Sequence, residues 1–446
     1  MKIKLTETAK DEVQRTVSFA LNITGTDKAA ENGVVCVQSP RYASPFSCQE
    51  IYVKDLAKGE SITIELPYSF SYGGRHVFYF WQKGRKLESL KQKVVCMRGA
   101  GMYSGNTHSH SVYSDGKSTL SQNRRVMMKN GHSFIYATDH NTINHLEELK
   151  AYEPQGRKEH FLHIPGWEYT TKYGHAIAYG SEKLYEPDKI LERNNLEAWQ
   201  AYVNAMQNEH ATVFFAHPYE APKYEFGEAV LSHIKGIAGV EAWNGYNYHA
   251  LAYQNQKNFA IWDALNRRGD RHYSGNAVSD AHTKRGQSSP YIKGYCEELS
   301  QKAVEEMLDK GTFIGSNGPD IQLCIGDASV GQTYVLPKSK KNQPQKARIQ
   351  LDVFDPLGEI EAIQIYRGIV DGEYTSHPNT VKIMEFYPVG EAEKRNYVKT
   401  LYIDVKPKEF YRAEVVTATG VVAYMADRTK PEKGFAFTNP IWIEEE

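Results

Sequence analysis

The sequence has few cysteines, no long apolar runs and almost no excess of either charge. Its five cysteines are odd in number and widely spaced, with no CxxC pair, so they predict neither a disulfide framework nor a cysteine-ligated metal. No apolar run approaches the ~18 residues of a membrane span. The opening MKIKLTETAKDEV lacks the apolar segment of a signal peptide. These absences predict a cytoplasmic protein with reduced thiols and no membrane partner.

The charges are balanced. A net charge of -1 and a pI near 7.0 argue against a chain-wide surface for polyanions, so nucleic acid is not an expected partner. A hydrophobic fraction of 41% over 446 residues allows a sizeable core divided between two or three domains. No feature of the sequence bears on the oligomeric state.

Three regions differ in hydrophobic periodicity. Residues 1–98 alternate apolar and polar side chains, for example over 17–23 and 62–66, which predicts an antiparallel β-sandwich. Residues 99–319 alternate short apolar strands with helical stretches, which predicts an α/β fold with a parallel sheet, most simply closed as a barrel. Residues 320–446 return to period two and predict a second β-sandwich.

Helix signals recur in the middle region. Ser118 as N-cap and Gly131 as C-cap would bound one helix. The apolar spacing predicts further helices over 195–209, 251–268 and 299–310. Short apolar strands are expected at 134–137, 161–167, 212–216, 239–242 and 273–278.

Polar clusters follow nearly every one of these strands. His108 and His110 lie in an extended segment, where alternate side chains point the same way and can bind one metal ion. In a parallel αβ barrel, side chains at the C-terminal strand ends meet at one mouth. The candidate metal shell contains six histidines and three carboxylates: His108, His110, His140, His175, His217, His282, Asp115, Glu168 and Asp280.

Nine ligands exceed the three to five that one ion uses, so we expect two or three divalent ions. Glu168 has two carboxylate oxygens and can bridge a pair of ions. Imidazole and carboxylate ligands without thiolate suit Zn, Mn or Fe. His145 and His163 are close enough in sequence to orient ligands but are not expected to bind metal.

Five motifs occur in a fixed order: THSHSVYSDG, YATDHN, PGWEYTT with YGH, FFAHPY and SDAHT. As a set they resemble the PHP (polymerase and histidinol phosphatase) superfamily of metal-dependent hydrolases, over about residues 107–319. VEAWNG, FIGSNGP and FAFTNPIWI resemble its carbaryl-hydrolase-like (CehA/McbA) branch. The resemblance implies a distorted (β/α)7 barrel, flanked here by the N-terminal and C-terminal β-sandwiches.

The resemblance also implies three ion sites. Carried over by motif, the ligands are His108, His110, Glu168 and Asp280 for the first ion; Glu168, His175 and His217 for the second; Asp115, His140 and His282 for the third. Asp115 stands where some members use histidine, so an enzyme with two ions is the alternative.

Such a cluster predicts hydrolysis. A hydroxide bridging two metals is available near neutral pH because the ions lower the pKa of water, and they also neutralise charge on the attacked centre. We expect a phosphoesterase, either a phosphatase or a phosphodiesterase, acting on a small phosphorylated metabolite, with Glu168, Asp280 and His217 taking part in catalysis. A carbamate or other ester hydrolase is the alternative that the branch implies.

Substrate contacts are expected from four further residues. Lys284 and Arg285 follow the SDAH ligands and would clamp a phosphate, although ordinary surface charges fit them equally well. Tyr219 and Asn244 would line the substrate. A non-enzymatic hypothesis is a glycan-binding or scaffold protein with an inactive barrel, its aromatic residues within 68–81 stacking on sugars. The filled ligand positions argue against it.

Overall fold

The computed structural model describes the backbone of Gly59 and of strands β1 to β8 in the first hundred residues. Beyond them it describes residues 101–159 (backbone only at 155 and 157–159), 161–185, 195–220, 225–246, 250–337, 344–355, 359–375, 380–390, 393–420 and 432–446. The aromatic side chains considered above for sugar stacking, and the side chains of Cys36, Cys48 and Cys96, lie outside the described residues. Cys296 and Cys324 are free thiols.

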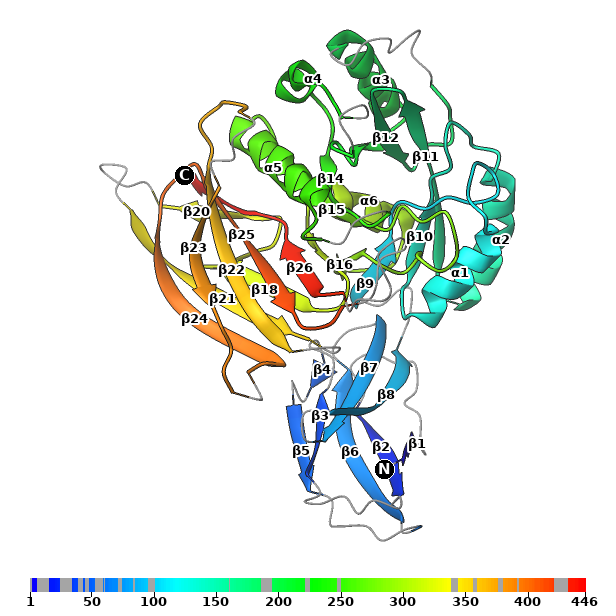
Figure 1. Cartoon of the computed structure of the whole chain (residues 1–446), viewed down its shortest axis with the longest axis vertical. Helices are drawn as coiled ribbons and strands as arrows, with labels where there is room; N and C mark the ends of the chain where they lie inside the picture. Colours follow the sequence, from blue (N-terminus) through cyan, green and yellow to red (C-terminus); the bar gives the residue numbers. More distant parts are fainter. Residues whose placement is uncertain are drawn as a thin grey trace.

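The first hundred residues form two four-stranded antiparallel sheets (Figure 1). The alternation at 17–23 and 62–66 falls on β2 and β6, which pair along their whole length, with Phe19 opposite Leu66. One sheet has the order β1 (Lys2–Leu5), β2 (Thr16–Thr24), β6 (Ser61–Phe70), β4 (Ala43–Ser44), and the other β5 (Cys48–Tyr52), β3 (Val34–Gln38), β7 (Gly74–Gln82), β8 (Arg85–Val94).

The central region is built on a mixed sheet with the strand order β15-β14-β13-β12-β11-β10-β9-β16-β17. Its strands are β9 (Gly101–Asn106), β10 (Phe134–Ala137), β11 (Leu162–Thr171), β12 (Gly174–Tyr179), β13 (Thr212–Ala216), β14 (Gly239–Asn244), β15 (Ser274–Val278), β16 (Tyr291–Cys296) and β17 (Phe313–Ser316). The pairs within β9-β10-β11 and β13-β14-β15 are parallel. The pairs β11-β12, β12-β13, β9-β16 and β16-β17 are antiparallel.

The expectation of a parallel sheet is therefore confirmed for β9-β10-β11 and β13-β14-β15 and wrong for the other pairs, and the pairing does not show the expected (β/α)7 barrel. Only Lys172 and Tyr173 separate β11 from β12, which is too short for the crossover that a parallel pair needs. The chain reverses there instead, with Gly174 at a φ of +129°. Beyond β9 and β15, the amide of His110 donates to the carbonyl of Ala281 (3.1 Å), so these two strand ends meet.

Six helices accompany the described central strands: α1 (Leu120–Lys129), α2 (Leu146–Glu159), α3 (Leu196–Asn208), α4 (Glu228–His233), α5 (Tyr253–Arg268) and α6 (Gln301–Lys310). The predicted N-cap of α1 was one residue early. Thr119 caps this helix, because its hydroxyl accepts from the amide of Gln122 (3.2 Å) while the Gln122 side chain accepts from the amide of Thr119 (3.1 Å). The C-cap is Asn130 rather than Gly131.

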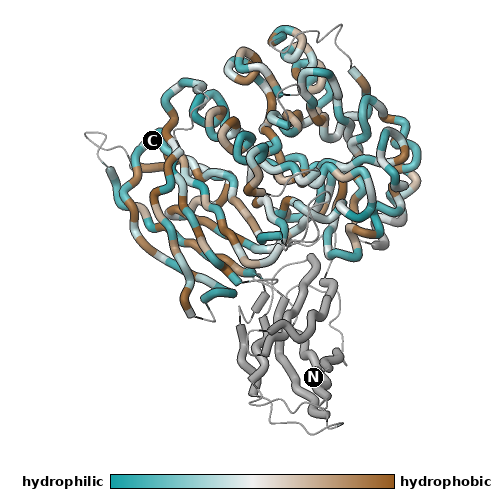
Figure 2. The backbone as a smooth tube through the Cα atoms, viewed as in Figure 1, coloured by the Kyte–Doolittle hydropathy of each residue, from teal (hydrophilic) through white to brown (hydrophobic). Residues whose placement is uncertain are grey.

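The C-terminal region is a second pair of sheets. One has the order β19 (Ala328–Ser329), β18 (Asp320–Ile325), β21 (Gln345–Phe354), β24 (Asn396–Val405). The other contains β26 (Gly434–Thr438), β25 (Glu409–Thr417), β22 (Ile360–Ile369), β23 (Val381–Phe386), β27 (Ile441–Glu445) and β20 (Thr333–Leu336). Hydrophobic and hydrophilic residues alternate along these strands (Figure 2), as the period-two pattern predicts.

The central and C-terminal regions share one sheet, because β17 pairs with β26. Aromatic packing follows the same route. Phe437 on β26 lies against Phe259 and Trp262 of α5, with ring centroids 4.9 and 5.6 Å apart, and Phe435 lies 5.5 Å from Trp243. The C-terminal strands thus pack on α5, the helix that supports β14 and β15.

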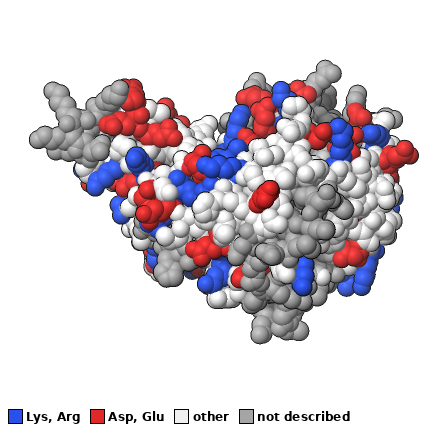
Figure 3. Space-filling model, turned by 90° about the horizontal axis from the view of Figure 1, so that it is seen from above, with Lys and Arg blue, Asp and Glu red and all other residues white. Residues whose placement is uncertain are grey.

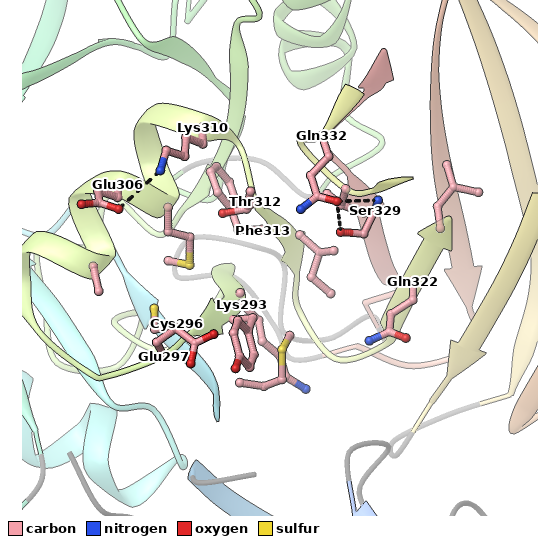
Figure 4. A pocket seen from close by; sticks show the side chains of 18 of the residues that line it. Lys293, Cys296, Glu297, Glu306, Lys310, Thr312, Phe313, Gln322, Ser329 and Gln332 are labelled. Atoms are coloured by element: carbon pink, nitrogen blue, oxygen red, sulfur yellow. Dashed lines mark hydrogen bonds and ion pairs between the residues drawn. The ribbon is translucent and has the colours of Figure 1, made fainter. Parts of the chain in front are cut away.

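A pocket of about 760 Å³ lies between α6, β16, β17 and the first C-terminal strands (Figure 4). Met102 at the start of β9 lines it, whereas the HxH motif follows the other end of that strand. This large cavity is therefore remote from the predicted metal ligands. On the face shown in Figure 3, the described acidic and basic residues are interspersed. None of the described helices is long and apolar enough to cross a membrane.

Candidate metal centre

The structure brings the nine predicted ligand side chains together at one end of the central sheet. They come from the segment after β9, from β11, from the start of β12 and from the segments after β10, β13 and β15. Ligand-type atoms of eight of them form three overlapping groups in which all atoms lie within 4.8 Å of one another: His108, His110 and Asp280; His140, Glu168 and His175; and His110, Asp115, His140 and His282. The ninth, His217, belongs to none of these groups, but its Nε2 lies 3.4 Å from Oε1 of Glu168.

The first group is deeply buried. The Nε2 atom of His110 lies 2.9 Å from Oδ1 of Asp280 and 3.0 Å from Nε2 of His108. The Nε2 atom of His108 lies 3.3 Å from the same Asp280 oxygen and 3.3 Å from Oε2 of Glu168. Two imidazole nitrogens and two carboxylate oxygens therefore point at one small volume, which is the spacing of ligands around an ion.

Glu168 is the centre of the cluster. Its Oε2 lies 2.7 Å from Nδ1 of His140, and its Oε1 lies 2.9 Å from Nδ1 of His175 and 3.4 Å from Nε2 of His217. With His108 and His110, whose Nε2 atoms lie 3.3 and 3.5 Å from Oε2, five histidines share this one carboxylate, which is completely buried. The grouping differs slightly from the one implied by the resemblance, because His140 joins His175 at Glu168.

The third group is the most exposed. The Oδ1 atom of Asp115 lies 3.2 Å from Nε2 of His282, 3.6 Å from Nε2 of His140 and 4.0 Å from Nδ1 of His110. The Asp115 side chain is 59% exposed, compared with 24% for His140 and 14% for His282. This group faces the solvent side of the centre.

Hydrogen bonds leave the Nε2 lone pairs of three histidines directed into the cluster. Nδ1 of His108 lies 2.7 Å from Oε1 of Glu241. Nδ1 of His140 lies 2.5 Å from the Thr170 hydroxyl, and Nδ1 of His282 lies 3.1 Å from the Asp280 carbonyl. In a neutral ring, donation from Nδ1 to these acceptors leaves Nε2 unprotonated, as in metal-binding histidines whose second nitrogen is held by the protein.

Two further features fit a metal centre. Nδ1 of His110, Nδ1 of His217 and Oε2 of Glu168 are buried and have no hydrogen-bond partner. His217 and Asp280 have positive φ values of 27° and 47°, a strained backbone for residues other than glycine. Unpartnered donors and acceptors at strained positions are costly unless something binds there. The donor set of imidazoles and carboxylates fits Zn, Mn or Fe.

The carboxylates and histidines of the cluster stabilise one another's charged forms. Burial would raise the pKa of Glu168, but His140, His108 and His175 outweigh it and hold the pKa well below its usual range. Burial would likewise raise the pKa of Asp280, and His108 and His110 lower it. Burial alone would lower the pKa of His108, but Asp280, Glu241 and Glu168 outweigh burial and hold the pKa well above its usual value. A proton on His108 thus occupies the place that a cation would take.

The sequence prediction missed Glu241 and Asp139. Glu241 is fully buried on β14; besides His108, it accepts from the amide of His217 (2.9 Å). A carboxylate inside the apolar run GVEAWN was the available signal, since a buried charge needs a partner. Asp139 is buried beside the ligand His140. Burial would raise its pKa, but hydrogen bonds from His145, Ser114 and Ser111 lower it to about 2.

The four residues predicted to bind substrate lie in different places. Nδ2 of Asn244 donates to Oδ2 of Asp280 (3.1 Å) and to Oε2 of Glu241 (3.0 Å), so Asn244 braces the ligands. Tyr219 lines a small pocket with His217, Asn244 and Asp280. Lys284 and Arg285 are exposed, and the structure does not bring either side chain to the ligand carboxylates.

The two histidines that the prediction left outside the shell also lie outside the three ligand groups. His145 is buried, with Nδ1 3.5 Å from Oδ2 of Asp139. His163 stacks on Tyr152, with ring centroids 6.1 Å apart. His145 therefore touches the cluster only through Asp139.

No family model matches the sequence, and no curated protein matches it. Several solved structures are similar. One is a two-domain protein from Bacteroides vulgatus containing a predicted PHP-like metal-dependent phosphoesterase, at 16% identity over 77% of this chain and 96% of that chain, with a TM-score of 0.38. Another is a proposed metal-dependent phosphoesterase from Bifidobacterium adolescentis, at 17% identity over 46% and 94% of the two chains, with a TM-score of 0.29.

A third similar structure is an amidohydrolase from Chromobacterium violaceum, at 15% identity over 40% of this chain and 87% of that chain, with a TM-score of 0.28. At these identities and TM-scores the likenesses carry no functional argument. The assignment rests on the residues of the cluster.

Proposed function

We propose that this protein is a metal-dependent hydrolase, and that its substrate is a small phosphate ester. The observation that carries the proposal is the buried Glu168 carboxylate, which faces five histidines from four different segments of the central region. A structural histidine needs one hydrogen-bond partner; convergence of this kind has no role in packing. It does suit divalent cations that share a bridging carboxylate.

The residues divide by role. His108, His110, Glu168 and Asp280 would hold one ion, Glu168 with His175 and His217 a second, and Asp115, His140 and His282 a third. Divalent ions bound there supply a water of lowered pKa and positive charge opposite the developing anion. We infer Zn, Mn or Fe from the ligand types.

Further residues orient the ligand side chains. Glu241, Thr170 and the Asp280 carbonyl fix the ring nitrogens of His108, His140 and His282. Asn244 orients the Asp280 carboxylate: Oδ2 accepts from the side-chain amide of Asn244, and Oδ1 faces the histidines. We assign Glu168, Asp280 and His217 to the reaction itself, because the small pocket that Tyr219 lines opens beside His217 and Asp280.

One observation favours a second candidate. In the part of the chain that the structure describes, no lysine or arginine side chain pairs with Asp115, Glu168 or Asp280. A phosphate would depend on the ions alone for charge neutralisation, whereas a carbamate or carboxylic ester brings no charge that needs a cationic clamp. A carbamate or ester hydrolase of the carbaryl-hydrolase type is therefore the alternative.

Parallel assays separate the two. Metal-loaded protein is given p-nitrophenyl phosphate, bis-p-nitrophenyl phosphate and an aryl methylcarbamate, and product release is followed with and without chelator. We expect chelator-sensitive release from a phosphate ester. Turnover of the carbamate alone would replace the phosphoesterase with the second candidate. No chelator-sensitive turnover of any ester would favour the glycan-binding or scaffold hypothesis.

A further inference from the structure

Asp139 lies next to the ligand His140 and has no assigned role, yet it is completely buried. We propose that Asp139 is a positioning residue that sets the affinity of the ion held by Asp115, His140 and His282, by bracing the loop that carries Asp115. The inference rests on the proposed metal centre and names the residue that controls one of its three sites.

Three hydrogen bonds join the Asp139 carboxylate to that loop. Its Oδ1 accepts from the amide of Ser111 (2.7 Å) and from the hydroxyl of Ser114 (2.7 Å). Its Oδ2 accepts from the hydroxyl of Ser111 (2.8 Å). Ser111 follows the ligand His110 and Ser114 precedes Asp115, so one buried carboxylate holds both ends of the turn between two ligands.

The backbone of Asp139 is tied to the centre as well. Its carbonyl accepts from the amide of Glu168 (3.2 Å), and the amide of the following Asn141 donates to the carbonyl of Glu168 (2.9 Å). Nδ1 of His145, which lies outside the three ligand groups, is 3.5 Å from Oδ2. These contacts fix the position of Asp139. Asp139 in turn fixes the positions of the loop and of His140.

The exposure of Asp115 is the reason that its loop needs the hydrogen bonds of Asp139. Asp115 is 59% exposed, whereas the carboxylates of the deeper groups are 0% exposed for Glu168 and 9% for Asp280. Neighbouring side chains pack around the deeper carboxylates. Asp115 turns Oδ1 toward His282 and His140 but is open to solvent on its other sides, so its direction depends on the loop backbone, which the Asp139 hydrogen bonds hold.

The test counts ions without any substrate. The full chain is dialysed to equilibrium against graded Mn²⁺, and bound Mn²⁺ is measured for wild type, Asp139→Asn, Asp115→Ala and the exposed control Asp327→Asn. Asparagine keeps the shape of Asp139 but cannot accept three hydrogen bonds in the same way. Asp115→Ala removes the ligand itself and shows which ion is affected.

We expect Asp139→Asn to raise the free Mn²⁺ needed to half-fill the weakest site by roughly tenfold, the lower end for residues that orient metal ligands. The two tighter ions should be unchanged, excess Mn²⁺ should restore the third, and Asp327→Asn should match wild type. Unaltered binding in Asp139→Asn, equal weakening of every ion, or full occupancy in Asp115→Ala would each overturn the inference.

Ser114→Ala covers the case in which Asp139→Asn does not fold, as judged by circular dichroism. It deletes one of the three hydrogen bonds at a half-buried side chain, and we expect about threefold weakening of the same ion. No change there overturns the inference. A wild type that binds two ions and never a third also overturns it but leaves a two-ion hydrolase intact. If Asp139→Asn selectively weakens the third Mn²⁺ site but no ester is hydrolysed, the inference stands and only the proposed function fails.

Discussion

At the scale of single residues, Glu241 decides which nitrogen of His108 can reach an ion. Its Oε1 lies 2.7 Å from Nδ1 of His108, and its Oε2 accepts from the amide of His217 and from Asn244. One carboxylate therefore orients a ligand of the first group and a ligand at Glu168. The ligands alone do not account for the geometry of the centre.

Replacing Glu241 with glutamine should weaken metal binding by roughly 10- to 100-fold, as removal of residues that orient ligands does. The amide can offer hydrogen to Nδ1 and so favours the wrong tautomer of His108. Mn²⁺ affinity by equilibrium dialysis measures the effect, and the exposed Glu298→Gln serves as the matched control. Wild-type affinity in Glu241→Gln would show that the tautomer is not set by this contact.

The histidines give the metal-free chain an unusual pH dependence. Burial lowers the pKa of His217, but the hydrogen bond to Glu168 and the charges of Asp280 and Glu220 outweigh it and raise the pKa to about 9, above the ordinary 6.5. A raised pKa contributes stability that is complete below pH 6.5 and is lost as the pH rises to about 9. His108 and His140 shift in the same direction.

We therefore expect the melting temperature of chelator-treated protein to fall between pH 6.5 and 9. Protein loaded with Mn²⁺ should not show this fall, because bound cations replace the protons that the histidines lose. Thermal melts of the two forms across this range, in matched buffers, test the contrast. Parallel curves with and without metal would mean that these histidines do not share their positions with cations.

Much of the site followed from the positions of single residues in the sequence. Seven of the nine predicted ligands follow short parallel strands, whose C-terminal ends converge, whereas Glu168 lies within β11 and His175 near the start of β12. Lys284 and Arg285 are exposed, and their role as phosphate contacts stays a prediction, because adjacency to a ligand in the sequence does not fix the direction of a loop side chain. Asp139 escaped notice because its role lies in three hydrogen bonds to a loop, which only the folded chain displays.

At the scale of elements, α5 and β25 are joined by a buried ion pair. The Arg412 guanidinium meets the Asp263 carboxylate through two contacts of 3.0 Å, and both side chains are at most 5% exposed. Arg412 also pairs with Glu414 and lies over the ring of Tyr366, 4.5 Å from its centroid. The C-terminal sheet thereby holds the helix that supports β14 and β15.

Arg412→Ala should destabilise this junction by about 3–5 kcal/mol, because it leaves the Asp263 carboxylate buried without its partner. The double variant Arg412→Met with Asp263→Leu should recover much of the loss, since an apolar pair needs no hydrogen bonds. Urea unfolding followed by tryptophan fluorescence compares both with the exposed Arg348→Ala, expected within about 0.5 kcal/mol of wild type. An equally stable Arg412→Ala would contradict the assigned role of the pair.

Elements with strong periodicity were predicted within a few residues, and interrupted ones were missed. The helices expected at 195–209 and 299–310 are present as α3 and α6. Helix α2 was missed because Pro154 and Gly156 break its pattern, and α4 because six residues hold too little periodicity. The strand β12 was not predicted, since its role as an antiparallel partner depends on β13, which begins only at Thr212.

At the scale of the whole molecule, the central and C-terminal regions are linked by a continuous 15-stranded sheet. A boundary between residues 319 and 320 remains a prediction, and β17 pairs with β26 across it. Periodicity marks where the type of structure changes, but it carries no information on pairing between strands more than a hundred residues apart. The packing of Phe437 on Phe259 and Trp262 was therefore not predictable from the sequence.

The account depends most on Glu168, which five histidines share. The most direct measurement is the metal content of wild type and Glu168→Ala, by elemental analysis of protein purified without added metal or chelator. We expect two or three equivalents of Mn, Zn or Fe in wild type and a loss of most of them in the variant, because several ligands lose their common partner. Less than one equivalent in wild type, unchanged by the substitution and not increased by added metal, would contradict the metal centre and the hydrolase built on it.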